Sequence, residues 1–165
     1  MSKRFNLREF QQGVLDRLQA QVEAGGGHVS TLGVQVGEEL WLVDMSDINE
    51  VLAPPPLTHV PLTKPWYRGV ANVRGNLYSI IDFGLYTGGA SIPLEGQSRV
   101  LLVGQKFAFN AGLLVSRVLG LRDARDWQRV EQNGEVRLQD GNGQWWRKLE
   151  MAKLLAQPEF LQIGA

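Results

Sequence analysis

The chain has 165 residues, of which 44% are hydrophobic and 21% are charged. These proportions are typical of a folded globular protein, and the length suits one domain or two very small ones. The 17 basic and 17 acidic side chains cancel, which argues against nucleic-acid binding and against electrostatic docking on anionic lipid. Cysteine is absent, so disulfides, thiolate nucleophiles and cysteine metal sites are excluded.

The first residues and the lengths of the apolar runs indicate where in the cell the protein is expected to lie. The first residues contain no apolar core of the signal-peptide type. No apolar run approaches the ~20 residues that a membrane-spanning helix needs. We therefore expect a cytoplasmic protein without direct insertion into a membrane.

Residues 6–24 are predicted to form an amphipathic helix. Asn6 and Glu9 have the spacing of a capping box. Apolar side chains then recur every three to four residues, namely Leu7, Phe10, Val14, Leu18 and Val22. The three glycines at 25–27 end this helix, so residues 1–26 form an N-terminal appendage. Its apolar stripe either packs on the domain, which we favour, or docks on a partner.

From residue 28 the apolar pattern takes the period of two that is typical of strands. Two hairpins are predicted across glycine-containing turns, one from strands at 28–36 and 40–43 and one from strands at 69–73 and 77–82. Further strands are predicted at 47–52, 98–104, 107–118 and 135–139. Residues 83–86 are expected to form one helical turn. Residues 145–146 begin a last strand or enter a final helix, which is predicted over 148–156 and closed by Pro158.

Many short strands, with helices mainly at the ends, predict a mainly all-β fold of barrels or a sandwich. The segment 90–96 is the best candidate for a boundary between two β halves. The domain after the N-terminal appendage then spans 27–162, with a first half at about 27–90 and a second at about 97–147.

Residues for catalysis are scarce. His28 and His59 are the only histidines, and neither has a second ligand at metal spacing. The sequence has no phosphate-binding loop and no nucleophile elbow. Asp44, Asp47 and Glu50 are spaced three apart and could mimic a metal site on a helix, but their β-rich surroundings favour a solvated edge. We expect neither a cofactor nor a metal.

The segment 69–82, which reads GVANVRGNLYSIID, resembles the signature of the CheW-like chemotaxis coupling family, roughly G-[VI]-x-N-[LV]-R-G-x-[VI]-[VI]-P-[VI]-[VI]-D-[LF]. Ser79 stands where the family usually has proline. Ser116 likewise replaces the aspartate of a V-D-x-V pattern in a later strand. The resemblance covers about residues 28–156. The extra helix, the proline-rich connection at 54–56 and the long polar insertion are most similar to the family's adaptors of type IV pilus chemosensory systems.

This resemblance implies two SH3-like, five-stranded β-barrel subdomains with an N-terminal and a C-terminal helix, and no active site. It implies a non-enzymatic adaptor that couples a methyl-accepting chemoreceptor to a CheA-type histidine kinase, at receptor arrays on the inner membrane. The output would be type IV pilus twitching motility. The alternative is a small β-barrel ligand-binding or hydrolytic domain, which would need a concave pocket with convergent polar groups.

The resemblance also carries binding residues over by position. The kinase-binding surface would include Met45 and Ile48, with Val51 and Leu52 as neighbours. The receptor-binding groove would include residues of one predicted strand and of the turn that follows it, namely Arg68, Gly69, Val70, Asn72 and Arg74. Glu50 and Arg74 correspond to a charged pair that links two strands beside these surfaces.

Overall fold

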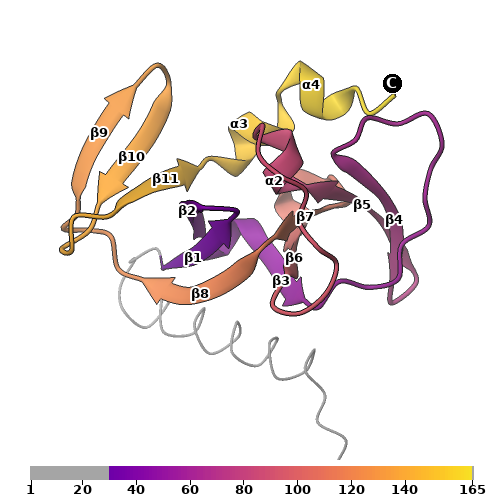
Figure 1. Cartoon of the computed structure of the whole chain (residues 1–165), viewed down its shortest axis with the longest axis horizontal. Helices are drawn as coiled ribbons and strands as arrows, with labels where there is room; N and C mark the ends of the chain where they lie inside the picture. Colours follow the sequence, from indigo (N-terminus) through magenta and orange to yellow (C-terminus); the bar gives the residue numbers. More distant parts are fainter. Residues whose placement is uncertain (1–29, 165) are drawn as a thin grey trace, which may run out of the picture.

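The computed structural model describes residues 30–164 and consists mainly of strands in two sheets (Figure 1). The helix predicted over 6–24, the glycines at 25–27 and His28 lie outside the described residues. The fold class predicted from the sequence is confirmed, because two β subdomains form the body of the protein. Only one of the two sheets has the five strands expected for each subdomain, and the other has six.

Sheet A has six strands in the order β8-β1-β2-β11-β10-β9. They are β1 (Thr31–Val36), β2 (Glu39–Asp44), β8 (Arg117–Arg122), β9 (Gln128–Gln132), β10 (Glu135–Gln139) and β11 (Trp145–Leu149). Neighbours are antiparallel except β11 and β2, which are parallel. The 3-10 turn η1 (Met45–Asp47) leads from β2 out of this sheet.

Sheet B has five strands in the order β3-β6-β7-β5-β4. They are β3 (Ile48–Leu52), β4 (Tyr67–Val73), β5 (Asn76–Asp82), β6 (Arg99–Val103) and β7 (Ala111–Val115). The helical turns α2 (Phe83–Tyr86) and η2 (Gln105–Phe107) connect them, and β5 pairs with β7 in parallel. The predicted helical turn at 83–86 is therefore found, with Asp82 as its N-cap.

The two subdomains are not consecutive halves of the chain. Sheet B uses only residues 48–115, whereas sheet A takes strands from both sides of that stretch. Residues 90–96, where we expected a boundary, instead join α2 to β6 within sheet B, and Ile92 in this segment is buried. The chain crosses between the subdomains near η1 and again between Val115 and Arg117. This topology arises from strand pairings between distant segments, which local patterns do not encode.

One hydrophobic core joins both sheets. It includes Val34 and Val43 from sheet A and Leu101 and Leu113 from sheet B, each at most 1% exposed. A smaller cluster lies within sheet A and consists of Leu42, Val136, Leu138 and Trp146. The strands β4 and β10 bury alternate residues, as a period-two pattern predicts, whereas every residue of β7 is buried.

The C-terminal region differs from the prediction of one helix over 148–156. Lys148 and Leu149 pair with Leu42 and Val43 in the parallel β11–β2 ladder, so the helix α3 spans only Met151–Leu155. Pro158 does not close it but begins a second short helix, α4 (Pro158–Leu161). Proline suits this first helical position because its missing N–H needs no partner there.

The strand β9 was not predicted. Its five residues are all exposed, so it lacks the apolar alternation by which a strand is recognised. The neighbouring β10 has the bounds predicted from the alternation of Val136 and Leu138. Asn133 and Gly134 connect the two strands, and both have a positive φ, as a two-residue hairpin turn requires.

Candidate functional site

The β4–β5 hairpin contains the family-like motif and brings the predicted receptor-binding residues together. Its strands pair in register from Val73 opposite Asn76 back to Tyr67 opposite Ile81. At the turn, the backbone N–H of Gly75 donates to Oδ1 of Asn72 at 2.9 Å. Gly75 has φ +86°, a conformation that glycine adopts without steric cost.

Glu50 and Arg74 form an ion pair in the structure. Nη1 of Arg74 donates to Oε2 of Glu50 at 3.1 Å, and Nη2 donates to Oε1. The Glu50 side chain is 1% exposed and that of Arg74 is 50% exposed. These hydrogen bonds from the guanidinium to the carboxylate raise the pKa of Arg74.

This pair connects opposite edges of sheet B. Glu50 lies on β3, the first strand in the sheet order, and Arg74 follows β4, the last. Contact between them shows that the sheet curls so that its edges approach, as in a small barrel. The pair therefore fixes the position of the β4–β5 turn relative to β3.

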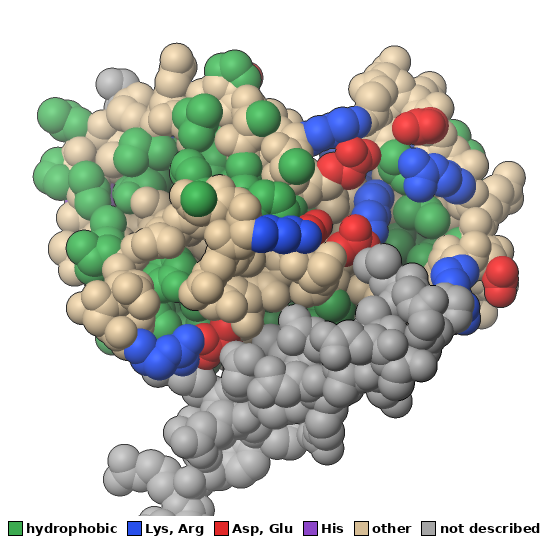
Figure 2. Space-filling model, turned by 180° about the vertical axis from the view of Figure 1, so that it is seen from behind, with side chains coloured by type: hydrophobic (Ala, Val, Ile, Leu, Met, Phe, Trp, Pro, Cys, Tyr) green, Lys and Arg blue, Asp and Glu red, His purple; other side chains and the backbone are tan. Residues whose placement is uncertain are grey.

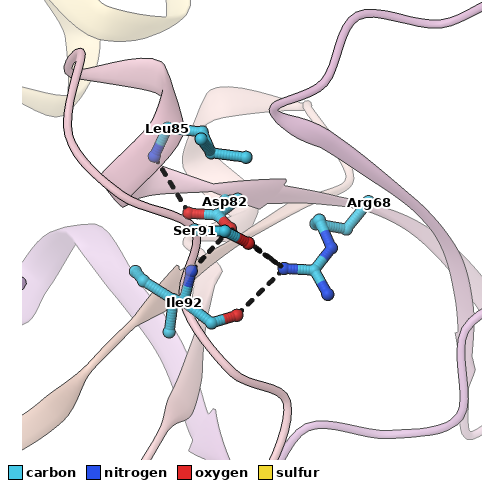
Figure 3. Close-up of polar contacts among 5 residues, drawn as sticks. All are labelled: Arg68, Asp82, Leu85, Ser91 and Ile92. Carbon is cyan, nitrogen blue, oxygen red and sulfur yellow. Dashed lines mark hydrogen bonds and ion pairs between the residues drawn. The ribbon is translucent and has the colours of Figure 1, made fainter.

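Arg68 and Asp82 form a second charged pair at the other end of the hairpin (Figure 3). Nη1 of Arg68 donates to Oδ2 of Asp82 and to the carbonyl oxygen of Ile92, both at 2.9 Å. The same carboxylate accepts from the backbone N–H groups of Leu85 at 3.0 Å and Ile92 at 2.9 Å, and from the Ser91 hydroxyl at 3.2 Å. Asp82 is fully buried, so it ties β4, α2 and residues 91–92 together.

Gly69 allows a close backbone approach. Its φ is +137°, and a Cβ at this position would lie 2.5 Å from the carbonyl oxygen of Thr58. Thr58 forms an isolated bridge with Val70, in which the two distances from backbone nitrogen to carbonyl oxygen are 2.8 and 2.9 Å. Gly69 therefore lets the proline-rich connection lie against β4. Arg68 is the extra residue of a bulge between Tyr67 and Gly69, and such a bulge redirects a side chain.

The accessible face of the hairpin includes Val70 and Asn72, which lie opposite Ser79 and Leu77 on β5. Leu77 is 61% exposed. Leu77 was not predicted to be a binding residue, although an apolar residue beside a glycine turn is a detectable signal in the sequence. Exposed apolar side chains of this kind are candidate anchors for a protein partner.

Hydrophobic side chains are gathered over the sheet B side of the molecular surface in Figure 2, opposite the β9–β10 hairpin. The large exposed ones outside sheet A are Leu62, Leu77, Leu94 and Leu161. Leu62 is 85% exposed and has φ +60°, an uncommon conformation for leucine. This side of the protein is thus the more suitable for an apolar contact.

The predicted kinase-binding residues lie together on η1 and β3, but their side chains are buried. Met45, Ile48, Val51 and Leu52 are at most 6% exposed. Ser46 is exposed, and Asp47 and Asn49 are partly exposed. The accessible surface of this segment is therefore formed by the residues between the predicted ones.

The three carboxylates considered as a metal site diverge. Asp44 pairs with Lys148, Asp47 pairs with Lys106 at 2.9 Å, and Glu50 pairs with Arg74. Within residues 30–164, no group of three or more His, Asp or Glu side chains is placed to hold a metal ion. Asp123 pairs with Arg125 at the surface, at 2.7 Å.

A cavity of about 250 Å³ lies between α2, the C-terminal helices and sheet A. Trp41, Phe83 and Tyr86 contribute aromatic walls, and Arg147 and Lys153 are among its charged residues. Arg147 lies with its guanidinium 4.3 Å from the centre of a Trp41 ring. Burial raises the pKa of Tyr86. The lining contains no histidine or serine, so it offers no hydroxyl–imidazole pair for hydrolysis.

Asp140 organises the turn between β10 and β11 and was not predicted from the sequence. Its carboxylate accepts from the N–H groups of Asn142 at 2.8 Å and Gln144 at 2.9 Å, and from Nε1 of Trp146 at 3.0 Å. The bond from Trp146 contributes most to a pKa of Asp140 below its ordinary value. Trp146 is buried and Trp145 is 47% exposed, as expected for consecutive residues of a strand.

Among the helices of residues 30–164, none has the length and apolar character to cross a membrane.

The chain is similar to known proteins in sequence and in structure. Protein PilI of Pseudomonas aeruginosa is 40% identical over 93 residues, which are 56% of this chain and 52% of that protein. The chain thus spans about half the length of this curated relative. The crystal structure of the scaffolding protein TtCheW from Thermoanaerobacter tengcongensis matches with a TM-score of 0.64 and 20% identity, over 79% of this chain and 94% of that one. This structural match shows the fold, with two SH3-like β subdomains.

The CheW-like domain model matches residues 30–159, which include both sheets and α3. The resemblance stated from the motif at 69–82 is thereby confirmed. This chain belongs to the CheW-like domain family.

Proposed function

We propose that this chain is a non-catalytic adaptor that couples a methyl-accepting chemoreceptor to a CheA-type histidine kinase. Family membership supports a coupling role in chemosensory signalling. The similarity to protein PilI supports an output through type IV pilus twitching motility. The adaptor would work in the cytoplasm, at receptor arrays on the inner membrane.

The observation that carries this proposal is the construction of the β4–β5 hairpin. An adaptor must present a fixed surface, because ordering a mobile loop on binding lowers affinity. Here the hairpin is held at its turn by Arg74–Glu50 and at its other end by Arg68–Asp82. Between these pairs, Val70, Asn72 and Leu77 remain accessible.

We assign receptor binding to this accessible face. Val70, Asn72 and Leu77 would contact the receptor tip directly. Arg68, Gly69 and Arg74 would act mainly by positioning, because Arg68 is engaged with Asp82 and Gly69 faces Thr58. An exposed leucine beside a polar amide suits an α-helical hairpin that offers alternating apolar and polar side chains.

Leu77→Asp tests this assignment. Leu161→Asp on α4 is a matched control, since Leu161 is 54% exposed and lies outside the hairpin. We expect Leu77→Asp to weaken binding of a receptor cytoplasmic fragment about tenfold in a calorimetric titration, as for loss of an interface anchor. The control should bind like the wild type. Equal binding by both variants would reject this face as the receptor site.

Kinase binding is assigned to the surface over η1 and β3. The residues that would contact the kinase regulatory domain are Ser46 and Asn49. The buried residues of this segment would support that surface without touching the kinase, namely Met45, Ile48, Val51 and Leu52. Because Met45 is buried, Met45→Asp would unfold the protein and cannot test binding. We therefore choose Ser46→Arg and Asn49→Arg, with Gln97→Arg on an exposed loop as control.

The double variant Ser46→Arg/Asn49→Arg should lose co-purification with the kinase and keep the wild-type melting curve. Gln97→Arg should retain the kinase. Retention of the kinase by the double variant would reject the η1–β3 surface. Failure of the full wild-type chain to co-purify with either native partner would reject the coupling function itself.

A further inference from the structure

The strand β9 forms an outer edge of sheet A (Figure 1). Within residues 30–164, β10 is the only strand paired with it. All five residues of β9 are exposed. An edge strand of this kind presents backbone N–H and C=O groups that can pair with a further strand.

The hairpin turn determines which backbone groups face outward. Asn133 and Gly134 form a two-residue loop, closed by Gln132 opposite Glu135. Such a loop closes on a hydrogen-bonded pair, and the pairs then alternate along an antiparallel ladder. The backbone groups of Arg129 and Glu131 are therefore directed away from β10, and they are the ones available for a new partner.

The sequence of β9, Gln-Arg-Val-Glu-Gln, is symmetric about Val130 when charges are exchanged. We propose that β9 is a self-association edge, on which β9 of a second copy pairs antiparallel about a twofold axis through Val130. Each Arg129 then lies opposite Glu131 of the second copy, and each Gln128 lies opposite Gln132. A twofold contact uses the same patch on both copies, so both charge pairs form at once.

The charges and the backbone select one register. Sliding by one residue would place outward backbone groups against inward ones, which removes the hydrogen bonds. Sliding by two residues in one direction places Arg129 opposite Arg129 of the second copy. Sliding by two in the other direction places Glu131 opposite Glu131 of the second copy. Like charges directly opposite are destabilising, so only the register centred on Val130 is favourable.

The side chains are free to change partners. Arg129 and Glu131 are 3.8 Å apart within the strand, and their side chains are 61% and 65% exposed. Five residues per copy bury far less than the ~1,200 Å² of a stable interface. The association is therefore transient, and it becomes significant only at high local concentration.

A cysteine substitution can trap this contact, because the native chain contains no cysteine. In the proposed register Val130 faces itself as a non-hydrogen-bonded pair, with Cα atoms about 4.5 Å apart. That separation falls within the range of a disulfide. Val130→Cys should therefore form a covalent dimer under mild oxidation.

Gln132→Cys is the matched control on the same strand. In the proposed register it faces Gln128 of the second copy, and its own counterpart is about 13 Å away. We expect roughly tenfold slower dimer formation than for Val130→Cys. A mixture of Gln128→Cys and Gln132→Cys chains should instead cross-link between unlike chains, which provides a second test if Val130→Cys is poorly folded.

Charge reversal gives the decisive comparison. Adding Arg129→Glu to Val130→Cys places Glu opposite Glu twice and should slow cross-linking roughly tenfold. Adding Arg129→Glu and Glu131→Arg together restores opposite charges and should restore the rate. Equal rates for Val130→Cys and Gln132→Cys, or no recovery in the exchanged variant, would overturn the proposal. Receptor or kinase binding does not enter this test, so the proposal is independent of the coupling function.

Discussion

Replacing Asp82 by alanine should be among the most destabilising single changes in this protein. The carboxylate caps α2 through Leu85, accepts the N–H of Ile92 and pairs with Arg68. Loss of an N-cap costs about 1 kcal/mol. A buried N–H without an acceptor costs about 1–3 kcal/mol.

The loss of Arg68 as a partner adds less, because its side chain is 23% exposed and can reach water. Since the three interactions share one carboxylate, their effects overlap rather than add in full. We therefore expect Asp82→Ala to lower the free energy of unfolding by about 2–4 kcal/mol. Urea denaturation followed by tryptophan fluorescence would measure this change.

Asp82→Asn keeps the shape of the side chain but has a single acceptor oxygen. If that oxygen caps α2 through Leu85, the NH2 group faces the donors of Ile92 and Arg68, so we still expect a loss of about 1–3 kcal/mol. A loss below about 1 kcal/mol for Asp82→Ala would refute the view that this buried carboxylate holds the segment 91–92 against α2.

Three further predictions concern the hairpin and the β10–β11 turn. Gly69→Ala should lower the free energy of unfolding by about 2–4 kcal/mol in urea melts, because the added Cβ would meet the backbone of Thr58. Gly75→Ala is the comparison: Gly75 has φ +86° and open space around it, so this variant should lose only about 1 kcal/mol. Arg74→Ala should lower the free energy of unfolding by about 1–2 kcal/mol, because it removes two donors from the buried Glu50 carboxylate while Arg74 itself is half exposed. A loss no larger than that of the surface variant Arg129→Ala would contradict this. Asp140 has a pKa below its ordinary 3.8, so its contribution to stability is present above pH ~4 and is lost as pH falls through its folded-state pKa. Urea midpoints of Asp140→Asn measured from pH 5 to pH 2.5 should therefore fall less steeply than those of the wild type.

The sequence predicted local structure well where pattern and turn chemistry agreed. The β4–β5 hairpin and the bounds of β10 follow from period-two alternation and glycine turns, and the helical turn at 83–86 was also predicted. The strand β9 escaped prediction because its exposed edge needs no apolar residues. The final helix was predicted too early because residues 148–149 suit a helix locally, whereas tertiary pairing with β2 places them in a strand.

The candidate site was predictable in part. Some of its residues lie close together simply because they are near neighbours in the sequence, as Val70, Asn72 and Arg74 are. Their long-range partners were harder to foresee: only the Glu50–Arg74 pair could be expected, and only through the family resemblance. Contacts such as Gly69 with Thr58, or Asp82 with Ile92, depend on how distant loops return to the sheet. Burial of Met45 and Ile48 likewise depends on the packing of sheet B on sheet A.

The insertion of sheet B between β2 and β8 has a consequence for synthesis on the ribosome. All strands of sheet B lie within residues 48–115, so this subdomain has its complete set before β8 is made. The β1–β2 hairpin, made first, must wait for β8 and β11 to cover both of its edges. During that interval the unpaired edges of β1 and β2 are open to premature pairing with other strands. Early folding of sheet B against the apolar side chains of this hairpin would protect it.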